Sequence, residues 1–362
     1  MPDPRKQVSA IPPYHPPLAG REGLRLDFNE NTIGPSPRVL DRLRTLTAED
    51  LARYPERQPI EASVSRFLGV STSELLLTNG VDEAIHLLCQ TYLDCGDEAL
   101  IVVPTYSMYR IYMAAAGAQV ISIASETDFK FPFQALRESI RDRTRMIAIA
   151  NPNNPTGTFT GFDQLLEIAR SAPAAAILID EAYFEFCGKT LLRERPQYPN
   201  LFVTRTFSKA YGLAGLRIGV LIGEADQMRS LRRVCSPYNV NAVALACLPA
   251  ALADQNYIER YVSETLASRA RLESALRNCG IQFWPSEANF VLARVGPTKS
   301  DSQAFVEHMR RRGILVRDRS LDHACEGCVR FTVGPEEHTT RLLIALDEVL
   351  QELPAFQGAS RS

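Results

Sequence analysis

The sequence predicts an α/β protein with two parts: a large domain whose mostly parallel sheet is flanked by helices, and a smaller α+β domain. The chain has 362 residues, which is more than a single hydrophobic core usually organises. Between residues 75 and 223, short apolar runs alternate with helical segments, as in a parallel sheet covered on both faces. Beyond residue 280, strands and helices follow each other in a different order, which favours a second, smaller domain.

The large domain is expected to span residues 31–245, whereas residues 1–30 and 246–362 are expected to form an N-terminal arm and the small domain. The start of the chain is rich in proline and polar residues, which predicts an extended arm. A short strand over residues 24–28 and helices near 37–47 and 58–68 are expected to follow.

The apolar runs of the large domain predict strands over residues 75–80, 99–104, 119–124, 144–150, 174–180, 201–206 and 217–223. Helices are predicted between them over residues 82–93, 106–117 and 161–172, and the pattern is helical from 224 to 279. The small domain is then expected to contain strands over 289–295, 314–318 and 329–333, a helix over 302–313 ending at a glycine, and a last helix beginning near Pro335.

Composition excludes several classes of protein. The chain is 45% hydrophobic and 23% charged, its net charge is −2, and it has no block of like charges, so we expect no nucleic-acid or membrane surface. Its eight cysteines are scattered, which favours a reducing, cytoplasmic setting. We expect no signal peptide, and the longest mostly apolar run, residues 242–253, contains Pro249 and is too short to span a bilayer.

Three of the predicted strands end in polar side chains. The strand over 144–150 runs into Asn151 and Asn154, the next ends in Asp180, and the strand over 201–206 is followed by Ser208 and Lys209. In open parallel sheets the carboxyl ends of the strands share one rim, where ligands bind. We therefore expect these side chains to converge on one site.

Lys209 and Asp180 indicate the chemistry of that site. A lysine just after a buried strand is unusual unless its amine has a function, and we hypothesise that Lys209 forms a Schiff base with pyridoxal phosphate. A carboxylate at the end of an apolar strand needs a partner, and a protonated pyridine nitrogen provides one for Asp180. The alternative for Asp180 is an ordinary cap of the segment that follows.

Other side chains suit the remaining parts of this cofactor. Tyr183 and Asn154 are expected near the phenolic oxygen, although Tyr183 alone would also fit a packing role beside neighbouring phenylalanines. Tyr106 follows a strand and is expected to stack on the ring, with an ordinary helix-face aromatic as the alternative. Backbone donors at Gly80, Val81 and Asp82, with Ser208 and Arg217, are expected to hold the phosphate, and Asp82 is expected to cap the helix.

Two arginines interrupt apolar strands near the end of the chain, Arg317 and Arg330. A planar guanidinium suits bidentate capture of a carboxylate or phosphate, while strand alternation also allows both to lie on a solvated face. The pair Cys325 and Cys328 forms a lone CxxC without the second pair that a zinc site needs, so we predict no metal.

These residues lie in motifs that resemble those of the fold-type I pyridoxal-phosphate aminotransferases, and among them the histidinol-phosphate aminotransferase branch. The matching segments run nearly end to end: PYHPPLAG, DFNEN, RYP, TNGVDEAI, PTYSMY, NPNNPTG, IDEAYFEF, TFSKAYGLAGLRIG, PYNVN, ANFVL, GILVRD and VRFTVG. The chain departs from the family where the usual NENP reads Asn29-Glu30-Asn31-Thr32 and where the glycine of PYxPG is displaced to Gly20.

The resemblance implies roles for each residue. Lys209, Asp180 and Tyr183 would be catalytic, and the substrate would contact Tyr14, Asn31, Arg317 and Arg330. The cofactor would be held by Gly80, Val81, Asp82, Tyr106, Asn154, Asp180, Tyr183, Thr206, Ser208, Lys209 and Arg217, with Tyr54 reaching the phosphate of a neighbouring subunit. It also implies a homodimer.

The expected reaction is transfer of an amino group from L-histidinol phosphate to 2-oxoglutarate. An aromatic amino-acid aminotransferase and a threonine-phosphate decarboxylase are the alternatives that keep the cofactor. A transcription regulator built on the same fold is a further alternative, but the segment before Asn29 is short and rich in proline, which disfavours a DNA-binding module there.

Overall fold

The computed structural model describes residues 2–15, 17 and 20–352. Its strands are β1 (Leu24–Arg25), β2 (Leu75–Thr78), β3 (Glu98–Val103), β4 (Gln119–Ala124), β5 (Thr144–Ala150), β6 (Ala176–Asp180), β7 (Leu201–Thr206), β8 (Gly219–Ile222), β9 (Gln282–Trp284), β10 (Phe290–Arg294), β11 (Ile314–Leu315), β12 (Arg317–Asp318) and β13 (Cys328–Thr332). Its α-helices are α1 (Lys6–Ser9), α2 (Pro37–Arg44), α3 (Ala48–Ala52), α4 (Gln58–Leu68), α5 (Gly80–Tyr92), α6 (Ser107–Ala116), α7 (Phe133–Glu138), α8 (Phe162–Ser171), α9 (Phe184–Cys187), α10 (Ala225–Val234), α11 (Ala242–Leu252), α12 (Gln255–Asn278), α13 (Lys299–Arg311) and α14 (Glu336–Glu352).

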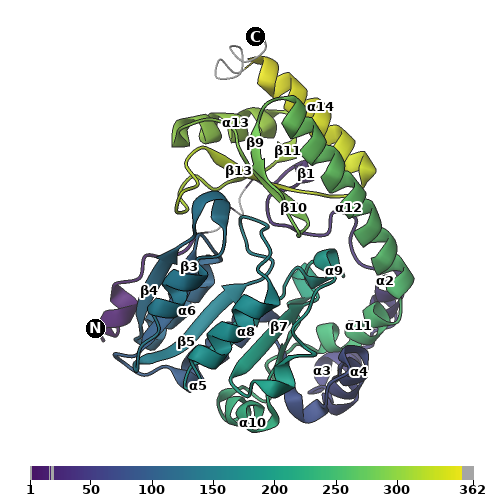
Figure 1. The fold of residues 1–362 in the computed structure, drawn as a ribbon. Coiled ribbons are helices and arrows are strands. Elements are labelled where there is room, and N and C mark those ends of the chain that lie inside the picture. The colour runs from purple at the N-terminus through teal and green to yellow at the C-terminus, as the bar shows by residue number, and fades with distance from the viewer. Residues whose placement is uncertain (1, 16, 18–19, 353–362) are drawn as a thin grey trace.

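The large sheet has seven strands in the order β2-β8-β7-β6-β5-β3-β4 (Figure 1). Strand β8 is antiparallel to both of its neighbours, and the other neighbouring pairs are parallel. The prediction of a mostly parallel sheet is therefore confirmed. Because parallel strands are joined by crossovers, the carboxyl ends of β5, β6 and β7 lie side by side, which is where the candidate site forms.

Alternation along the strands supplies two apolar faces. In β5, Met146 and Ala148 pack into the cluster that contains side chains of α5, α6 and α10, whereas Ile147 and Ile149 pack into the cluster with α8. Successive strand residues point to opposite faces, so an almost wholly apolar strand needs helices on both sides. This is why the run TRMIAIA has no polar alternation.

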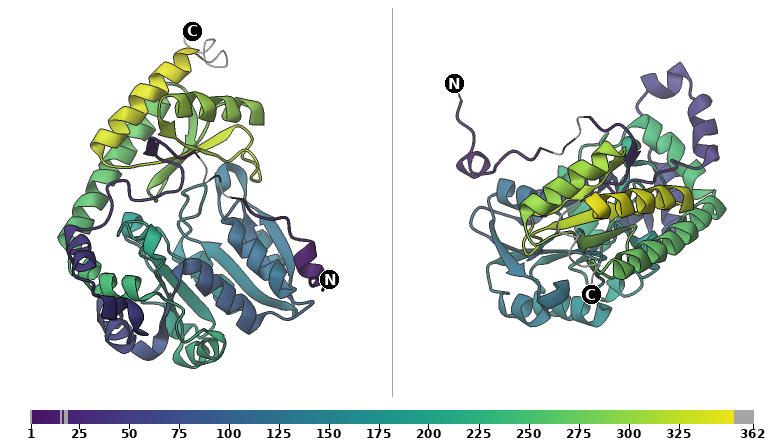
Figure 2. Two further views of the ribbon diagram at one scale, coloured as in Figure 1. Left: turned by 180° about the vertical axis from the view of Figure 1, so that it is seen from behind. Right: turned by 90° about the horizontal axis from the view of Figure 1, so that it is seen from above.

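The C-terminal part contains a four-stranded antiparallel sheet in the order β12-β13-β10-β9, covered by α12, α13 and α14 (Figure 2). Helix α12 runs from the large sheet to this smaller one (Figure 1). The N-terminal segment joins the same part, because β1 pairs in parallel with β11. The α+β order was predicted, whereas the domain boundaries at residues 31 and 245 stay a prediction.

Several elements differ from the expectation. The first residues are not wholly extended, because α1 forms a short helix that docks on α6 through a hydrogen bond from Arg5 to the Ala115 carbonyl at 2.6 Å. The strand expected over 24–28 is limited to β1, and β9 was not predicted at all.

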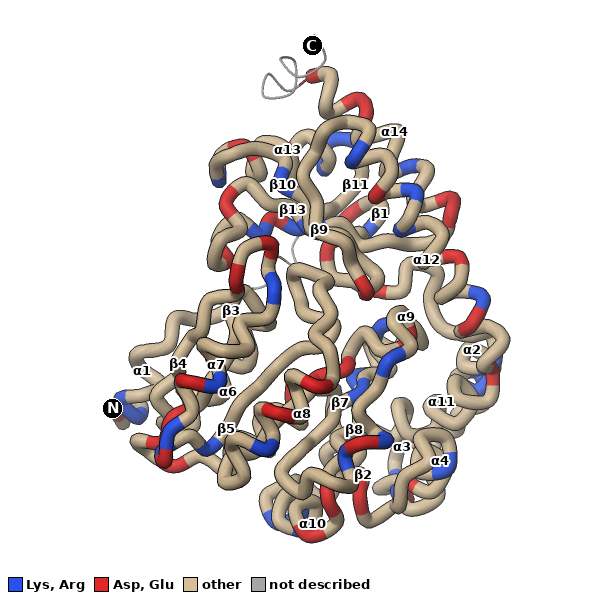
Figure 3. The backbone as a smooth tube through the Cα atoms, viewed as in Figure 1, with Lys and Arg blue, Asp and Glu red and all other residues tan. Residues whose placement is uncertain are grey.

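Basic and acidic residues are interspersed along the backbone (Figure 3). Within the described residues, no helix is both long and apolar enough to cross a bilayer.

Candidate active site

A cavity of about 570 Å³ lies at the carboxyl ends of β5, β6 and β7 and is closed by residues from the small sheet. It brings together most of the residues to which the resemblance assigns a role: Tyr14, Val81, Asp82, Tyr106, Asn154, Asp180, Tyr183, Thr206, Ser208, Lys209, Arg217, Arg317 and Arg330. Asn151, also expected there, does not line the cavity, because its side-chain amide bonds the Thr160 backbone at 3.0 and 2.8 Å. Asn154, Asp180 and Lys209 meet here because three parallel strands end at the same edge. The N-terminal segment adds Tyr14, and the small sheet adds Arg317 and Arg330.

Lys209 follows β7 and is half-buried. Its Nζ donates a hydrogen bond to the Phe28 carbonyl at 2.9 Å and lies 6.0 Å from the centre of the Tyr183 ring. Burial, followed by the nearby charge of Arg330, lowers the Lys209 pKa from 10.5 to about 8. A substantial fraction of the amine is therefore neutral near physiological pH, as a nucleophile or a general base requires.

Asp180 ends β6 and is buried. Its carboxylate accepts hydrogen bonds from the Tyr109 hydroxyl at 2.7 Å, the Thr204 hydroxyl at 3.0 Å and the Ala182 backbone N–H at 3.1 Å. Burial raises the Asp180 pKa, and these hydrogen bonds oppose that rise. Among the described residues the carboxylate has no cationic partner, so a protonated ring nitrogen in the cavity would stabilise its charge.

The start of α5 provides a place for an anionic group. Gly80 opens this helix with φ +74°, and a Cβ at this position would lie 2.6 Å from Nη2 of Arg217. The Ser208 hydroxyl oxygen is buried and has no hydrogen-bond partner among the described residues. A helix N-terminus, a guanidinium and an unpartnered hydroxyl together suit a phosphate.

Asp82 does not cap α5 as expected. The N-cap is Asn79, and Asp82 lies in the first turn of the helix. Its carboxylate accepts the Tyr106 hydroxyl at 2.8 Å and pairs with Arg217 at 3.1 Å. The Asp82 carboxylate therefore orients Tyr106, which is expected at the ring, and Arg217, which is expected at the phosphate. Its backbone N–H is also part of the helix N-terminus.

Tyr183 and Asn154, expected at the phenolic oxygen, have protein partners of their own. The Tyr183 hydroxyl accepts from Nδ2 of Asn29 at 2.9 Å, and its ring meets Phe290 edge to face at 5.1 Å. Oδ1 of Asn154 accepts from Nη1 of Arg330 at 2.5 Å. The Asn154 contact links the loop after β5 to the small sheet.

Arg330 is buried, and its two hydrogen bonds go to the neutral oxygens of Asn154 and of the Asp27 carbonyl, the latter at 2.7 Å. Burial, and next the charge of Arg319, lowers the Arg330 pKa to about 9. Arg317 also lines the cavity and lies over the Phe28 ring at 5.2 Å. Arg319 lines the cavity as well and pairs with Asp322 at 2.5 Å.

Three further expected residues lie outside the cavity lining. Gly80 is adjacent to it through Arg217. Asn31 lines a neighbouring cavity, and its Nδ2 donates to the Ala210 carbonyl at 2.9 Å. Tyr54 is 75% exposed and stacks on Tyr238 with ring centres 4.0 Å apart. An exposed aromatic pair of this kind is suited to contact with another chain.

Four residues that take part in the site were not predicted from the sequence: Tyr109, Thr204, Asn29 and Arg319. Two carry a periodic signal, since Tyr109 is three positions after Tyr106 in a helix start and Arg319 is two positions after Arg317 in a strand region. The other two act through partners far away in sequence, so no local pattern identifies them.

The donor set fits pyridoxal phosphate. A half-buried amine of lowered pKa, a buried carboxylate without a cation and a helix N-terminus with an unpartnered hydroxyl line one cavity or border it. These are the groups required by its aldehyde, its pyridine nitrogen and its phosphate.

Comparison with known proteins identifies the family of the chain. The family model "Aminotransferase class I and II" matches residues 21–346. Histidinol-phosphate aminotransferase 1 of Thiobacillus denitrificans is 36% identical over 98% of this chain and 95% of its own length. The histidinol-phosphate aminotransferase of Roseobacter denitrificans is 37% identical over 90% of this chain and 91% of its own.

A solved structure has the same fold. The histidinol-phosphate aminotransferase of Sinorhizobium meliloti, crystallised in complex with pyridoxal-5'-phosphate, superimposes with a TM-score of 0.87 at 24% identity. The match covers 96% of this chain and 97% of that one. At this identity the likeness supports the fold.

Proposed function

The chain belongs to the class I and II aminotransferases, and we propose that it transfers the amino group of L-histidinol phosphate to 2-oxoglutarate in histidine biosynthesis. It is a pyridoxal-phosphate-dependent transaminase of fold type I. The relatives at 36% and 37% identity carry the histidinol-phosphate aminotransferase name and are covered almost end to end, which supports this choice of donor.

The observation that carries the substrate proposal is the arginine cluster. Arg317, Arg319 and Arg330 line the same cavity as Lys209. Asp322 pairs with Arg319, while Arg330 contacts only neutral oxygens. Positive charge is therefore left for an anionic substrate group, and a guanidinium binds both a phosphate and the distal carboxylate of 2-oxoglutarate.

The bound cofactor supplies an aldehyde that takes up the amino group and an aromatic ring that draws electrons from the substrate α-carbon. Asp180 would hold the protonated ring nitrogen of the cofactor, and the hydroxyls of Tyr109 and Thr204 keep that carboxylate in place. Nζ of Lys209 accepts and returns the α proton, because its lowered pKa makes the neutral amine available. Arg330 fixes the acidic end of the substrate, which orients its α-carbon toward Lys209.

The test compares amino donors under identical conditions. The change in cofactor absorbance is followed with L-histidinol phosphate, L-phenylalanine and O-phospho-L-threonine, and single-turnover rates are measured. We expect kcat/KM for histidinol phosphate to exceed the others by at least about tenfold, equivalent to about 1.4 kcal/mol. A clear preference for phenylalanine would reject the donor, and release of CO₂ from phosphothreonine would indicate a decarboxylase.

We further propose that the protein is a homodimer and that it is located in the cytoplasm. Tyr54 and Tyr238 are both exposed and form a stacked pair that suits contact with a second copy, through which Tyr54 would reach the neighbouring phosphate site. All eight cysteines, each within the described residues, are free thiols, as expected in a reducing compartment. Sedimentation of the holoenzyme tests the dimer, and a monomer with full activity would reject it.

A further inference from the structure

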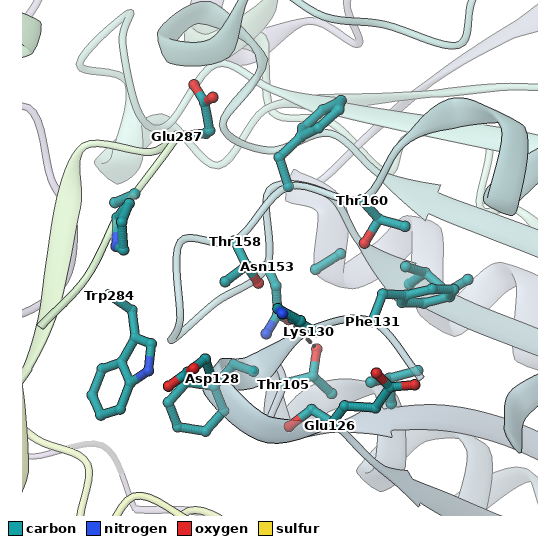
Figure 4. Close-up of a pocket in the computed structure, with 18 of the residues that line it drawn as sticks. Thr105, Glu126, Asp128, Lys130, Phe131, Asn153, Thr158, Thr160, Trp284 and Glu287 are labelled. Atoms are coloured by element: carbon teal, nitrogen blue, oxygen red, sulfur yellow. Dashed lines mark hydrogen bonds between the residues drawn. The ribbon is translucent and has the colours of Figure 1, made fainter. Parts of the chain in front are cut away.

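A second cavity, of about 830 Å³, is lined in part by the loop that follows β5 (Figure 4). Asn153 of this loop lines the second cavity, whereas the adjacent Asn154 lines the Lys209 cavity. Residues 126–131 after β4 and residues 282–287 from β9 onward form its other walls. The cavity therefore lies between the two sheets, and nothing in the transamination reaction uses it.

Aromatic rings form much of this cavity. Phe131, Phe159 and Phe283 line it and are only half-buried. Phe129 and Trp284 meet edge to face with ring centres 4.7 Å apart. The Trp284 indole N–H is buried and has no hydrogen-bond partner among the described residues, and Trp284 lines the cavity (Figure 4). The volume and the lining suit a small flat molecule.

Charges of both signs surround the rings. Lys189 and Glu287 neutralise each other at 3.3 Å. In contrast, the exposed side chains of Glu126, Asp128 and Lys130 have neither a hydrogen bond nor an ion pair within the described part of the chain. Lys130 and Asn153 both line this cavity (Figure 4). Two free carboxylates disfavour a polyanion such as a nucleotide, and the lysine provides a partner for a single carboxylate.

We propose that this cavity is a second ligand site that binds a small aromatic zwitterion, such as a free aromatic amino acid. The aromatic ring lies among the phenylalanines, the carboxylate binds Lys130, and the ammonium binds Glu126 and Asp128. The site lies where the segment after β9 contacts the loop after β5. The Glu287 backbone N–H donates a hydrogen bond to the Gly157 carbonyl there, at 2.8 Å. A ligand there stabilises the arrangement of the loop that also presents Asn154 to Arg330.

The chain provides its own reporter, because Trp284 is its single tryptophan. The experiment titrates the holoenzyme with α-methyl-L-phenylalanine while tryptophan emission is recorded; this probe has no α proton and cannot be transaminated. The holoenzyme is first reduced with borohydride, which prevents exchange of the probe amine at Lys209. We expect a saturable change in the tryptophan emission of the reduced enzyme.

Variants and truncated probes identify the site and the ligand class. Both Lys130→Glu and Glu126→Lys change exposed residues and are expected to weaken binding at least tenfold. Lys299→Glu, an exposed lysine with the same change of charge on α13, is expected to leave it unchanged. Phenylpropionate and phenethylamine, each lacking one charge, are expected to bind more weakly. Absence of a saturable signal, equal affinity in Lys130→Glu, or equal affinity for the truncated probes would overturn the proposal.

Discussion

The Tyr109 hydroxyl donates a hydrogen bond to Oδ2 of Asp180 across 2.7 Å, and the Tyr109 side chain is completely buried. Tyr109 and Asp180 both line the cavity, and the tyrosine hydroxyl holds the carboxylate in place. Because burial raises the Asp180 pKa and this hydrogen bond lowers it, Tyr109 helps to keep Asp180 ionised.

Replacing Tyr109 by phenylalanine is expected to lower kcat about tenfold, because a hydrogen bond to a charged group contributes about 1.5–3 kcal/mol. The Asp180 pKa rises further without this donor, so the loss is expected to grow as pH falls. The pH profile of kcat measures it. Tyr92→Phe on α5 is the control, since it removes a tyrosine hydroxyl that donates to Oε1 of Gln227 at 2.8 Å instead of to Asp180. A pH-independent loss of equal size in both variants would contradict the role of Tyr109.

Replacing Gly80 by alanine is expected to weaken cofactor binding at least tenfold. The new Cβ would lie 2.6 Å from Arg217, whose guanidinium would be displaced from the phosphate site. Gly69→Ala is the matched control, because Gly69 has a similar φ of +68° but nothing within 4 Å of the added Cβ. Both variants should lose about 1 kcal/mol of stability through backbone strain. Equal cofactor affinity in the two variants would show that the added Cβ at position 80 does not disturb the phosphate site and acts only through backbone strain.

Attachment of cofactor to the apo protein is expected to accelerate as pH rises through about 8, the pKa of Lys209. The neutral amine is the reactive form, and it predominates above that pKa. Since Arg330 contributes to lowering this pKa, Arg330→Gln is expected to shift the midpoint to higher pH. Stopped-flow absorbance after mixing with pyridoxal phosphate measures both. A rate that is flat across this range would show that Lys209 is not the limiting nucleophile.

Arg319→Gln is expected to raise KM for a phosphate-bearing donor about tenfold, because a hydrogen bond between charged groups contributes about 1.5–3 kcal/mol. The effect on 2-oxoglutarate is expected to be smaller, since a carboxylate carries less charge than a phosphate. Steady-state kinetics with each substrate varied separately provides the comparison. Arg311→Gln, an exposed pair partner of Glu307 on α13, serves as the control. An equal increase in KM for both substrates would show that Arg319 does not recognise the phosphate specifically.

Local sequence patterns were sufficient to predict the strands that are buried on both faces. Strands β5 and β6 were predictable because they lie between two apolar layers and most of their residues are apolar, and β7 begins with the apolar run LFV. Asn151, Asp180 and Lys209 therefore stood out at or just after the ends of these strands. The shared edge of a parallel sheet then placed them together.

What the sequence did not predict depends on tertiary contacts. Helix α1 has four residues and none is buried, so only its docking on α6 explains it. Strand β9 is a three-residue edge strand without alternation. Asn29 adopts φ +56° and meets Tyr183 from 154 positions away. No local period encodes such pairs, because they form only when the two sheets pack together.

The most direct test of the account is the position of the covalent link between protein and cofactor. The holoenzyme is reduced with borohydride, digested, and its peptides are mapped by mass spectrometry. The account predicts that the cofactor mass is found on Lys209 alone and that Lys209→Ala yields no labelled peptide. A label on another lysine, or none on Lys209, would contradict it.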